Sequence, residues 1–383
     1  MQDHGETRNR LLASAIQLFS QKWYGTVSVA EICREAGLSN GVFYRYFNDK
    51  EDLFRSILGS VHEMIAQAIA QAERDPQGDL FRSFTSVIIR FSADHPDLIA
   101  VFREGQYRFL DHERRLEELY ERSLGRALGR EVGVAENVFA LGGMRFCAIR
   151  AALQGVPIDS ESVHRILRGG LFPSLRASPE RVFAGPVNPL PIGIEEGSCE
   201  SLLRAGKRLF GEKGFFETNI HEITDAADLS VGAFYTYFPS KDSFFAELIR
   251  RVGRDIRHFL AVNIPGGLNR LETEMRGLWL FALYLQSDKD CYNIVREAEF
   301  VLPAEVASYY GAFVDGYRRH SLTAEGLADG IDERTAIEFL LGVNHYLGIA
   351  SVFADTFGNI RSKVETIGGY LTAGFSGLLD GGA

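Results

Sequence analysis

The chain has 383 residues, and its 41 Lys and Arg against 51 Asp and Glu give a formal net charge of −10 at pH 7. The length exceeds one typical domain, and the acidic balance argues against a protein that coats nucleic acid with a uniformly basic surface. The scattered cysteines have neither disulfide nor zinc spacing, and no secretory signal or apolar run of about 20 residues is present, so we expect a cytoplasmic protein with no membrane partner.

The first predicted elements form a helix-turn-helix unit. Apolar residues recur at helical spacing over 10–19, which predicts a first helix. Ser28 and Glu31 have the spacing of a capping box, so a short second helix begins there. A tight turn follows, and a third helix is predicted over 39–46. A fourth helix begins after Asp49, which is a good N-cap residue.

The same block returns without a gap in the second half of the chain. Leu38 aligns with Leu229 and Lys50 with Lys241, and Asn219 stands in the capping position of Ser28. Two copies of a short helical unit suggest a molecule that meets a target with two-fold or pseudo-two-fold symmetry, and duplex DNA is the leading candidate. Neither block is strongly basic, which predicts weak, salt-sensitive binding to non-specific DNA.

Each block is followed by more than a hundred residues with helical periodicity. A segment rich in Pro and Gly, 177–199, separates the halves and is predicted to be a linker. Duplication of a whole two-domain unit is the economical explanation. The helices predicted in these regions are 80–93, 97–107, 113–128, 135–153, 160–175, 333–353 and 359–379.

Both blocks resemble the N-terminal DNA-binding domain of the TetR family of transcriptional regulators. The residues that carry the resemblance are Gly41, Phe43, Tyr44, Tyr46, Phe47, Lys50 and Glu51, and Gly232, Phe234, Tyr235, Tyr237, Phe238, Ser240, Lys241 and Asp242. The resemblance implies an all-α fold of two tandem TetR-like units, each a three-helix helix-turn-helix domain followed by a helical ligand-binding and dimerisation domain. The expected boundaries are 1–54 and 55–176 for the first unit, 177–199 for the linker, and 200–245 and 246–383 for the second unit.

The resemblance also implies phosphate contacts. Tyr44 and Tyr235 match the family's phosphate-contacting tyrosine, and Lys50 and Lys241 match its lysine at the start of the fourth helix. The competing interpretation is that the tyrosines pack the three-helix core and the lysines are solvated. We expect this core role for the remaining aromatic residues Phe43, Tyr46, Phe234 and Tyr237.

The two recognition helices carry different side chains. Arg45 suits guanine and Asn40 suits adenine in the major groove, whereas Thr236 and its neighbours offer mainly apolar contact. We therefore expect an operator with two dissimilar half-sites. The full set of predicted DNA-binding residues is Ser28, Ser39, Asn40, Val42, Tyr44, Arg45, Lys50, Thr218, Ser230, Val231, Ala233, Tyr235, Thr236 and Lys241.

One block departs from the other in the turn between the second and third helices. Asp228 stands where the first block has Gly37, in a turn that often needs a left-handed backbone, which Asp tolerates at some cost. Val27 likewise stands where the second block has the hydroxyl residue Thr218. Neither change disables a block, but one degenerate block is an alternative.

A small molecule bound in the companion domain shifts the DNA-binding heads in the family, so the resemblance implies an unidentified small-molecule effector and no other cofactor. Candidate ligand contacts are polar residues inside apolar helical runs: Arg145, Arg150, Asn344 and His345. Interface packing is the alternative role for each of them. The last two helices of each half are expected to form a four-helix interface, either within one chain as a pseudo-dimer or between two chains as a homodimer.

The predicted function is therefore a sequence-specific DNA-binding transcriptional regulator, a ligand-responsive repressor with two recognition helices. The alternative is an all-helical small-molecule binding or carrier protein with degenerate DNA-binding heads. An enzyme is a distant third, because the sequence has no nucleophile elbow, phosphate loop or metal-spaced cluster, and we expect no catalytic and no metal-binding residue.

Overall fold

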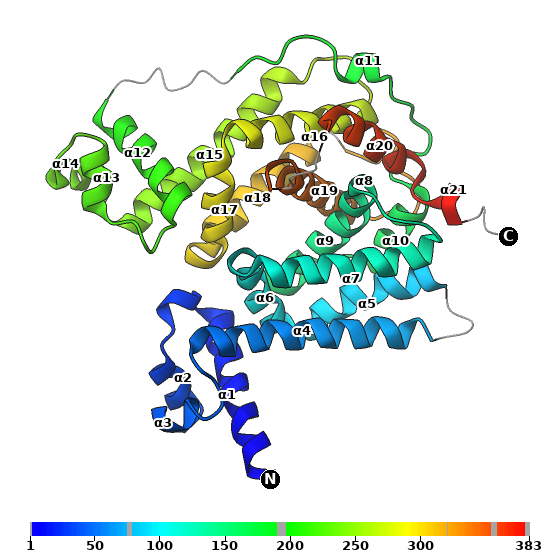
Figure 1. Cartoon of the computed structure of the whole chain (residues 1–383). Coiled ribbons are helices and arrows are strands. Elements are labelled where there is room, and N and C mark those ends of the chain that lie inside the picture. The colour runs from blue at the N-terminus through cyan, green and yellow to red at the C-terminus, as the bar shows by residue number, and fades with distance from the viewer. Residues whose placement is uncertain (1, 75–78, 190–196, 320, 354–357, 380–383) are drawn as a thin grey trace. The chain divides into compact units, whose positions relative to one another are not determined.

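A computed structural model describes residues 2–74, 79–189, 197–319, 321–353 and 358–379, and Figure 1 shows the course of the chain. These residues form helices and no strands, which confirms the predicted all-α class. The chain divides into two compact units, one made of residues 1–133, 143–165 and 375–383 and the other of residues 134–142 and 166–374. None of the described helices has the length and apolar character that crossing a membrane requires.

The first unit contains one helix-turn-helix head and the helices that follow it. In Figure 1, α4, α5 and α7 lie side by side, and each contacts the other two. The helices predicted over 80–93, 97–107 and 113–128 are confirmed to within three residues. The bounds are α1 (Gln2–Gln21), α2 (Val29–Glu35), α3 (Asn40–Phe43), α4 (Lys50–Ala72), α5 (Leu80–Asp94), α6 (Pro96–Arg108), α7 (Leu110–Leu128) and α9 (Gly143–Gln154), with the short 3-10 turn η1 (Tyr24–Thr26).

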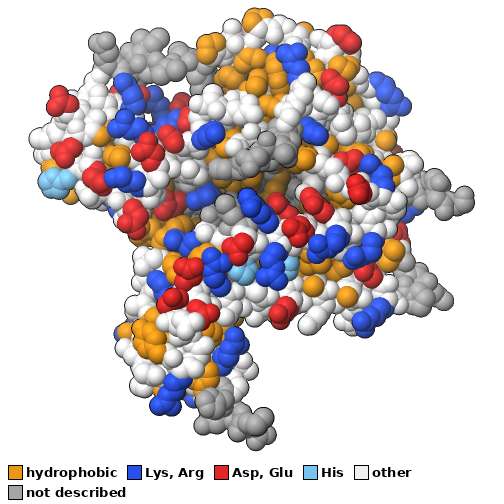
Figure 2. Space-filling model, viewed as in Figure 1, with side chains coloured by type: hydrophobic (Ala, Val, Ile, Leu, Met, Phe, Trp, Pro, Cys, Tyr) orange, Lys and Arg blue, Asp and Glu red, His pale blue; other side chains and the backbone are white. Residues whose placement is uncertain are grey.

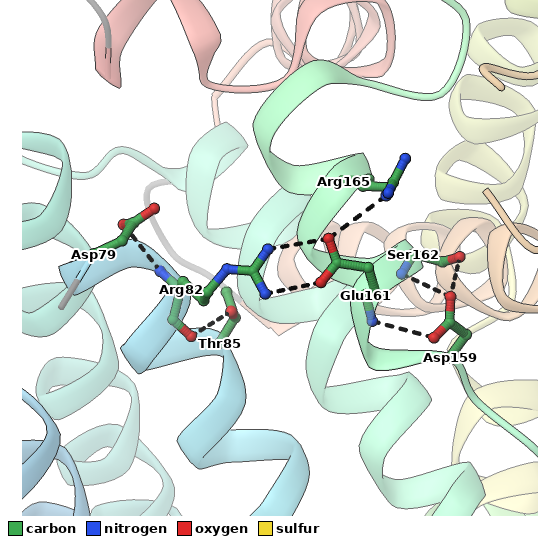
Figure 3. A network of polar contacts seen from close by, with 7 residues as sticks. All are labelled: Asp79, Arg82, Thr85, Asp159, Glu161, Ser162 and Arg165. Carbon is green, nitrogen blue, oxygen red and sulfur yellow. Dashed lines mark hydrogen bonds and ion pairs between the residues drawn. The ribbon is translucent and has the colours of Figure 1, made fainter. Parts of the chain in front are cut away.

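A polar network ties the start of α5 to the start of α10 (Ser160–Gly169), as Figure 3 shows. Asp79 caps α5 by accepting from the backbone of Arg82 at 3.2 Å, and Asp159 caps α10 by accepting from the backbone of Ser162 at 3.0 Å. Arg82 donates two hydrogen bonds, of 2.8 and 3.0 Å, to Glu161. Exposed ion pairs contribute only about 0–1 kcal/mol, so the main effect of this pair is to orient the two helix ends.

The second unit contains the second head and most of the second half. Three of its helices, α13, α15 and α16, begin with a complete capping box. The bounds are α8 (Val134–Asn137), the π-helical η2 (Val138–Gly142), α11 (Pro179–Val182), α12 (Ser198–Lys213), α13 (Ile220–Ala226), α14 (Val231–Tyr237), α15 (Lys241–Asn263), α16 (Arg270–Ser287), α17 (Lys289–Val301), α18 (Pro303–Arg318), α19 (Glu333–Phe353) and α20 (Ile360–Ala373).

Inside this second unit, residues of the first half of the chain pack against the last helices of the second half. The ring of Phe139 stacks on Tyr370, with centroids 5.6 Å apart, and meets Phe339 edge-on at 5.4 Å. The Tyr370 hydroxyl donates to the carboxylate of Glu136 at 2.6 Å. These contacts belong to the predicted four-helix interface, although residues 143–165 of that prediction group with the first unit.

Two glycines show that the ends of α10 and α20 meet reciprocally. Both adopt a left-handed backbone, with φ of 80° at Gly170 and 55° at Gly374. A Cβ atom at Gly170 would lie 2.6 Å from the carbonyl oxygen of Thr372, and one at Gly374 would lie 2.6 Å from that of Arg168. Each helix end therefore packs on the backbone of the other, which is the arrangement of a pseudo-two-fold interface within one chain.

The predicted linker 177–199 is partly wrong, because its first part is packed onto the second unit. It contains the short helix α11, and the guanidinium of Arg276 donates to the carbonyls of Val182 and Ala184, both at 3.0 Å. Arg276 is only 2% exposed. Such a buried cation must be hydrogen-bonded, so the segment supplies acceptors that the core requires.

Three predicted helix ends are also wrong. The recognition helix predicted over 39–46 ends at Phe43, and turn residues follow it. The helix predicted over 160–175 ends at Gly169, and the one predicted over 359–379 is broken at Gly374 into α20 and α21 (Ser376–Leu379). The left-handed glycines described above end both helices, because the opposing backbone leaves no room for another turn. Residues 190–196 of the predicted linker lie outside the described residues.

Candidate nucleic-acid interface

The first head buries one side of its recognition segment and exposes the other. Phe43 and Phe47 fill the interior of the head. Asn40 and Arg45 are exposed, and so is 62% of Tyr44. The side chains predicted to face base edges and phosphates are therefore open to a ligand, except that Val42 beside them is half-buried.

The second head has the same plan with a longer recognition helix, α14. Phe234 is buried, whereas 54% of Tyr235 is exposed. Thr236 is exposed, and its hydroxyl donates to the carbonyl of Gly232 at 3.1 Å. The expected core role of Tyr237 is wrong, because this tyrosine follows the last buried position of α14 and is 47% exposed. The half-buried Val231 and Ala233 complete the predicted face.

The predicted hydroxyl contacts fall into two groups. Ser28 and Ser230 are exposed N-cap residues whose oxygens accept backbone hydrogen bonds at 3.1 and 3.2 Å, and Ser39 occupies the N-cap position of α3. Thr218 is 1% exposed, and its hydroxyl donates to the carbonyl of Gly214 at 2.8 Å. Its hydroxyl is thus used inside the fold and is not presented to DNA.

Lys50 and Lys241 point back into their own heads. The Lys50 amine donates to the carbonyls of Tyr24 and Val27, both at 2.7 Å, and lies 4.2 Å from the centre of the Tyr24 ring. Lys241 repeats this geometry with the carbonyls of Phe215 and Thr218, at 2.9 and 3.0 Å. Burial lowers the pKa of both lysines. Each lysine therefore fastens the start of its fourth helix to the loop after the first helix.

A glutamate from a helix after each head holds the same loop. The carboxylate of Glu104 on α6 accepts from the backbone N–H of Tyr24 at 2.9 and 3.1 Å. In the second half, Glu297 on α17 accepts from the N–H of Phe215 at 2.6 Å. Both carboxylates are buried. The prediction of site residues missed them, although the recurrence of Arg-Glu at 103–104 and 296–297 was the available signal.

The turn of each helix-turn-helix needs the left-handed backbone that the sequence predicts. The φ angle is 64° at Gly37 and 55° at Asp228. Asp228 is the one described residue other than glycine with a positive φ. The turn is therefore formed in both heads, and Asp228 carries the strain in the second.

A cavity of about 840 Å³ lies in the second unit, between α15, α16, α17, α18 and α19. The predicted ligand contacts Asn344 and His345 line it. Arg145 and Arg150 lie in the first unit, where Arg145 pairs with Glu113 at 2.8 Å and Arg150 donates to Gln154. Arg145 lines a void of about 30 Å³.

Charged side chains of both signs are interspersed on the face drawn in Figure 2. Among the described residues, no group of three His, Cys, Asp or Glu side chains is placed to hold a metal ion.

Comparison with known proteins finds the same two blocks. The family model described as bacterial regulatory proteins, tetR family, matches residues 11–57 and 202–248. The chain is 29% identical over 109 residues to the uncharacterized HTH-type transcriptional regulator YuxN of Bacillus subtilis, covering 28% of this chain and 38% of that protein. It is 43% identical over 56 residues to the HTH-type transcriptional regulator AcrR of Shigella flexneri, covering 15% of this chain and 26% of that protein.

Solved structures of regulators match about half of the chain's length each. The fatty acid degradation regulator FadR from Bacillus halodurans is 14% identical with a TM-score of 0.40, covering 48% of this chain and 98% of its own. Salmonella enterica GusR is 19% identical with a TM-score of 0.39, covering 49% of this chain and 98% of its own.

Proposed function

The chain belongs to the TetR family and carries the family's DNA-binding domain twice, and we propose that it is a sequence-specific transcriptional regulator that responds to a small molecule. The observation that carries this proposal is the pair of complete helix-turn-helix heads. In each, the aromatic core is buried while the outer face of the recognition segment is exposed. The outer face of the recognition helix is the one that a helix-turn-helix domain lays in the major groove.

The proposed operator has two dissimilar half-sites. Arg45 and Asn40 in the first head can donate to and accept from base edges, and both are exposed. The second head presents Thr236, whose hydroxyl is already bonded to its own helix, beside the apolar Val231 and Ala233. Its readout is therefore mainly apolar contact, for example with a thymine methyl group.

The proposed phosphate contacts come from the exposed tyrosines and from the lysines at the start of each fourth helix. Tyr44 and Tyr235 project from the heads, and their hydroxyls are free to reach the DNA backbone. Lys50 and Lys241 each donate two hydrogen bonds inside their own head. The third N–H of each ammonium group can donate to a nearby phosphate. We leave Thr218 out of the proposed contact surface because of its burial.

The proposed response to a ligand runs through α17. Val295 and Arg296 on this helix line the cavity, and the adjacent Glu297 holds the loop of the second head. A ligand that displaces α17 therefore moves the carboxylate that holds the head. Allosteric coupling of this kind typically amounts to about 1–3 kcal/mol, or about 5- to 150-fold in affinity.

In-vitro selection from a random duplex library, followed by light scattering of the recovered complex, tests this function. We expect two dissimilar half-sites and one chain per duplex. The variant Arg45→Ala should cost about 1–3 kcal/mol and relax specificity in one half-site, while Thr236→Ala should affect only the other. Each variant is thus the matched control for its partner.

Three other outcomes would revise the proposal. A strict palindrome with two chains bound would indicate a homodimer that uses one kind of head. If either single variant relaxed the specificity in both half-sites, the proposal that each head reads one half-site would be contradicted. If no sequence is enriched, the cavity would favour the alternative of an all-helical small-molecule carrier.

A further inference from the structure

Among the described residues, the spaces between corresponding helices of the two halves differ in size. The second half encloses the cavity of about 840 Å³, which is in the size range of sites for organic ligands. The comparable position in the first half, between α4, α5, α6, α7 and α9, holds about 30 Å³. A void of that size accommodates a water molecule or two and excludes an organic ligand.

The sequence explains this difference in part. In the constant alignment of the two blocks, Gly253 on α15 stands where α4 has His62, and the His62 side chain is buried. The missing side chain at Gly253 leaves room for the ring of Tyr309, which comes within 2.9 Å of where a Cβ atom would be. In the first half, the ion pair between Arg145 and Glu113 occupies interior volume instead.

Two arginines of the cavity wall, Arg257 and the more exposed Arg319, have no ion pair among the described residues. Arg257 lines the cavity, and among the described residues no carboxylate lies within ion-pair distance of it. Its guanidinium carbon lies 5.5 Å from the centre of the Phe313 ring. Burial lowers the pKa of Arg257, and Arg254 adds to the effect while Tyr309 opposes it. The other arginines of this stretch of α15 are paired: Arg250 with Glu305 at 3.7 Å, Arg251 with Glu200 at 3.0 Å and Arg254 with Glu247 at 2.8 Å.

The acidic residues of the cavity wall are already engaged. Glu274 pairs with Arg270 at 2.5 Å and accepts from the Tyr317 hydroxyl at 2.9 Å. Glu299 accepts from the hydroxyl of Tyr310 at 3.4 Å. The rest of the wall is largely apolar and aromatic, including Phe281, Leu285, Tyr292, Val295, Tyr309 and Phe313.

A half-buried guanidinium in an aromatic wall is stabilised by an anion that replaces the lost water. We propose that the second half binds one amphipathic organic anion per chain, with its acidic group at Arg257 and its apolar body against the aromatic wall, and that the first half binds none. This inference rests on the proposed function and names the chemical class of the effector. One ligand would then switch a molecule that carries two heads.

Two fluorescent probes with the same aromatic frame test the charge requirement on the full chain. Anilinonaphthalene sulfonate is anionic, and phenylnaphthylamine is neutral. We expect binding of the sulfonate probe to saturate at one molecule per chain. Arg257→Gln should lower the affinity for the sulfonate probe by about tenfold or more and change the affinity for the neutral probe by less than about threefold. Arg254→Gln, one turn earlier and paired on the surface, is the matched control and should leave both probes unchanged.

A second variant fills the cavity and leaves Arg257 in place. Ala312 lines the cavity, and Ala312→Trp should abolish binding of both probes by filling the space. Equal sulfonate affinity in Arg257→Gln and the original chain would overturn the inference, and so would two equivalent sulfonate sites per chain. Failure to select any DNA would remove the regulator function while leaving the probe result standing, so the two failures are distinguishable.

Discussion

At the scale of single residues, Lys50 and Lys241 have a role that their motif does not reveal. The sequence places each at the start of a fourth helix, where the family resemblance assigns a phosphate contact. The structure adds a bond from each amine to two carbonyls of a loop 23 and 26 residues earlier in the chain. Spacing in the sequence cannot show this, because the partners are main-chain atoms whose position depends on the folded head.

We expect Lys50→Ala to lower the free energy of unfolding by about 1–3 kcal/mol, because the carbonyls of Tyr24 and Val27 lose their donor. If the same amine also meets a phosphate, the salt dependence of DNA binding should flatten by about one unit of slope. Urea unfolding and a salt titration measure the two effects separately. Lys22→Ala is the control, because Lys22 is an exposed lysine paired with Glu31. Equal unfolding midpoints for the two variants would contradict the fastening role.

The left-handed turn residues predict opposite effects in the two heads. Asp228→Gly should stabilise the chain by about 1 kcal/mol, because glycine adopts a positive φ without the steric cost that a Cβ atom brings. Gly37→Asp should destabilise the first head by a similar amount. Urea midpoints of the two variants provide the measurement, and shifts of the same sign would show that something other than backbone strain dominates.

At the scale of elements, the sequence predicts the starts of helices better than their ends. Capping residues act locally, so Ser28, Asp49 and Asn219 mark true helix starts. The ends at Gly169 and Gly374 depend on the backbone of a distant helix, which no local pattern contains. The short α11 was missed although it has a local start signal, an N-cap Ser178 followed by Pro179, because it lies in a segment rich in Pro and Gly.

The sequence predicts only some of the residues that line the cavity. Asn344 and His345 were found because polar residues stand out in an apolar helix, and both line the cavity. Arg257 was missed, because α15 carries several arginines and only the structure shows which of them lack a carboxylate. Arg145 has the same polar-in-apolar signal as Asn344, but its partner Glu113 gives it a packing role.

The helix α7 contains a carboxyl group that should make the first unit sensitive to pH. Burial, reinforced by Glu113 and Glu121 and opposed by Arg145, raises the pKa of Glu117 from 4.5 to about 7. A raised pKa means that the folded state favours the protonated form. The stabilisation is therefore fully present below pH 4.5 and is lost as the pH rises through about 7.

Replacement of this carboxyl by an amide should remove that dependence. We expect Glu117→Gln to be more stable than the original chain at pH 8, by at most about 3 kcal/mol, and nearly equal to it at pH 4. Urea unfolding at both pH values is the measurement, and Glu118→Gln on the exposed side of α7 is the control. A stability difference that does not change with pH would rule out titration of Glu117 as its source.

At the scale of the whole molecule, one chain supplies both sides of an interface that two subunits would otherwise form. The reciprocal packing of Gly170 and Gly374 lies within a single compact unit, together with the Phe139 and Tyr370 contact. An interface satisfied inside the chain has no remaining need for a second copy. This favours a mass of one chain, 42.7 kDa, in solution.

Gly374 and Gly369 offer a matched pair that tests the interface. A Cβ atom at Gly374, just after α20, would lie 2.5 Å from the backbone of Arg168, whereas one at Gly369, inside α20, would meet nothing within 4 Å. Gly369→Ala should therefore stabilise the chain by up to about 1 kcal/mol through helix propensity, while Gly374→Ala should destabilise it by more than that. Urea unfolding measures both. Because the strained variant opens the contact between α10 and α20, light scattering should also detect association of chains for Gly374→Ala alone, and equal behaviour of the two variants would show that the reciprocal contact does not hold the halves together.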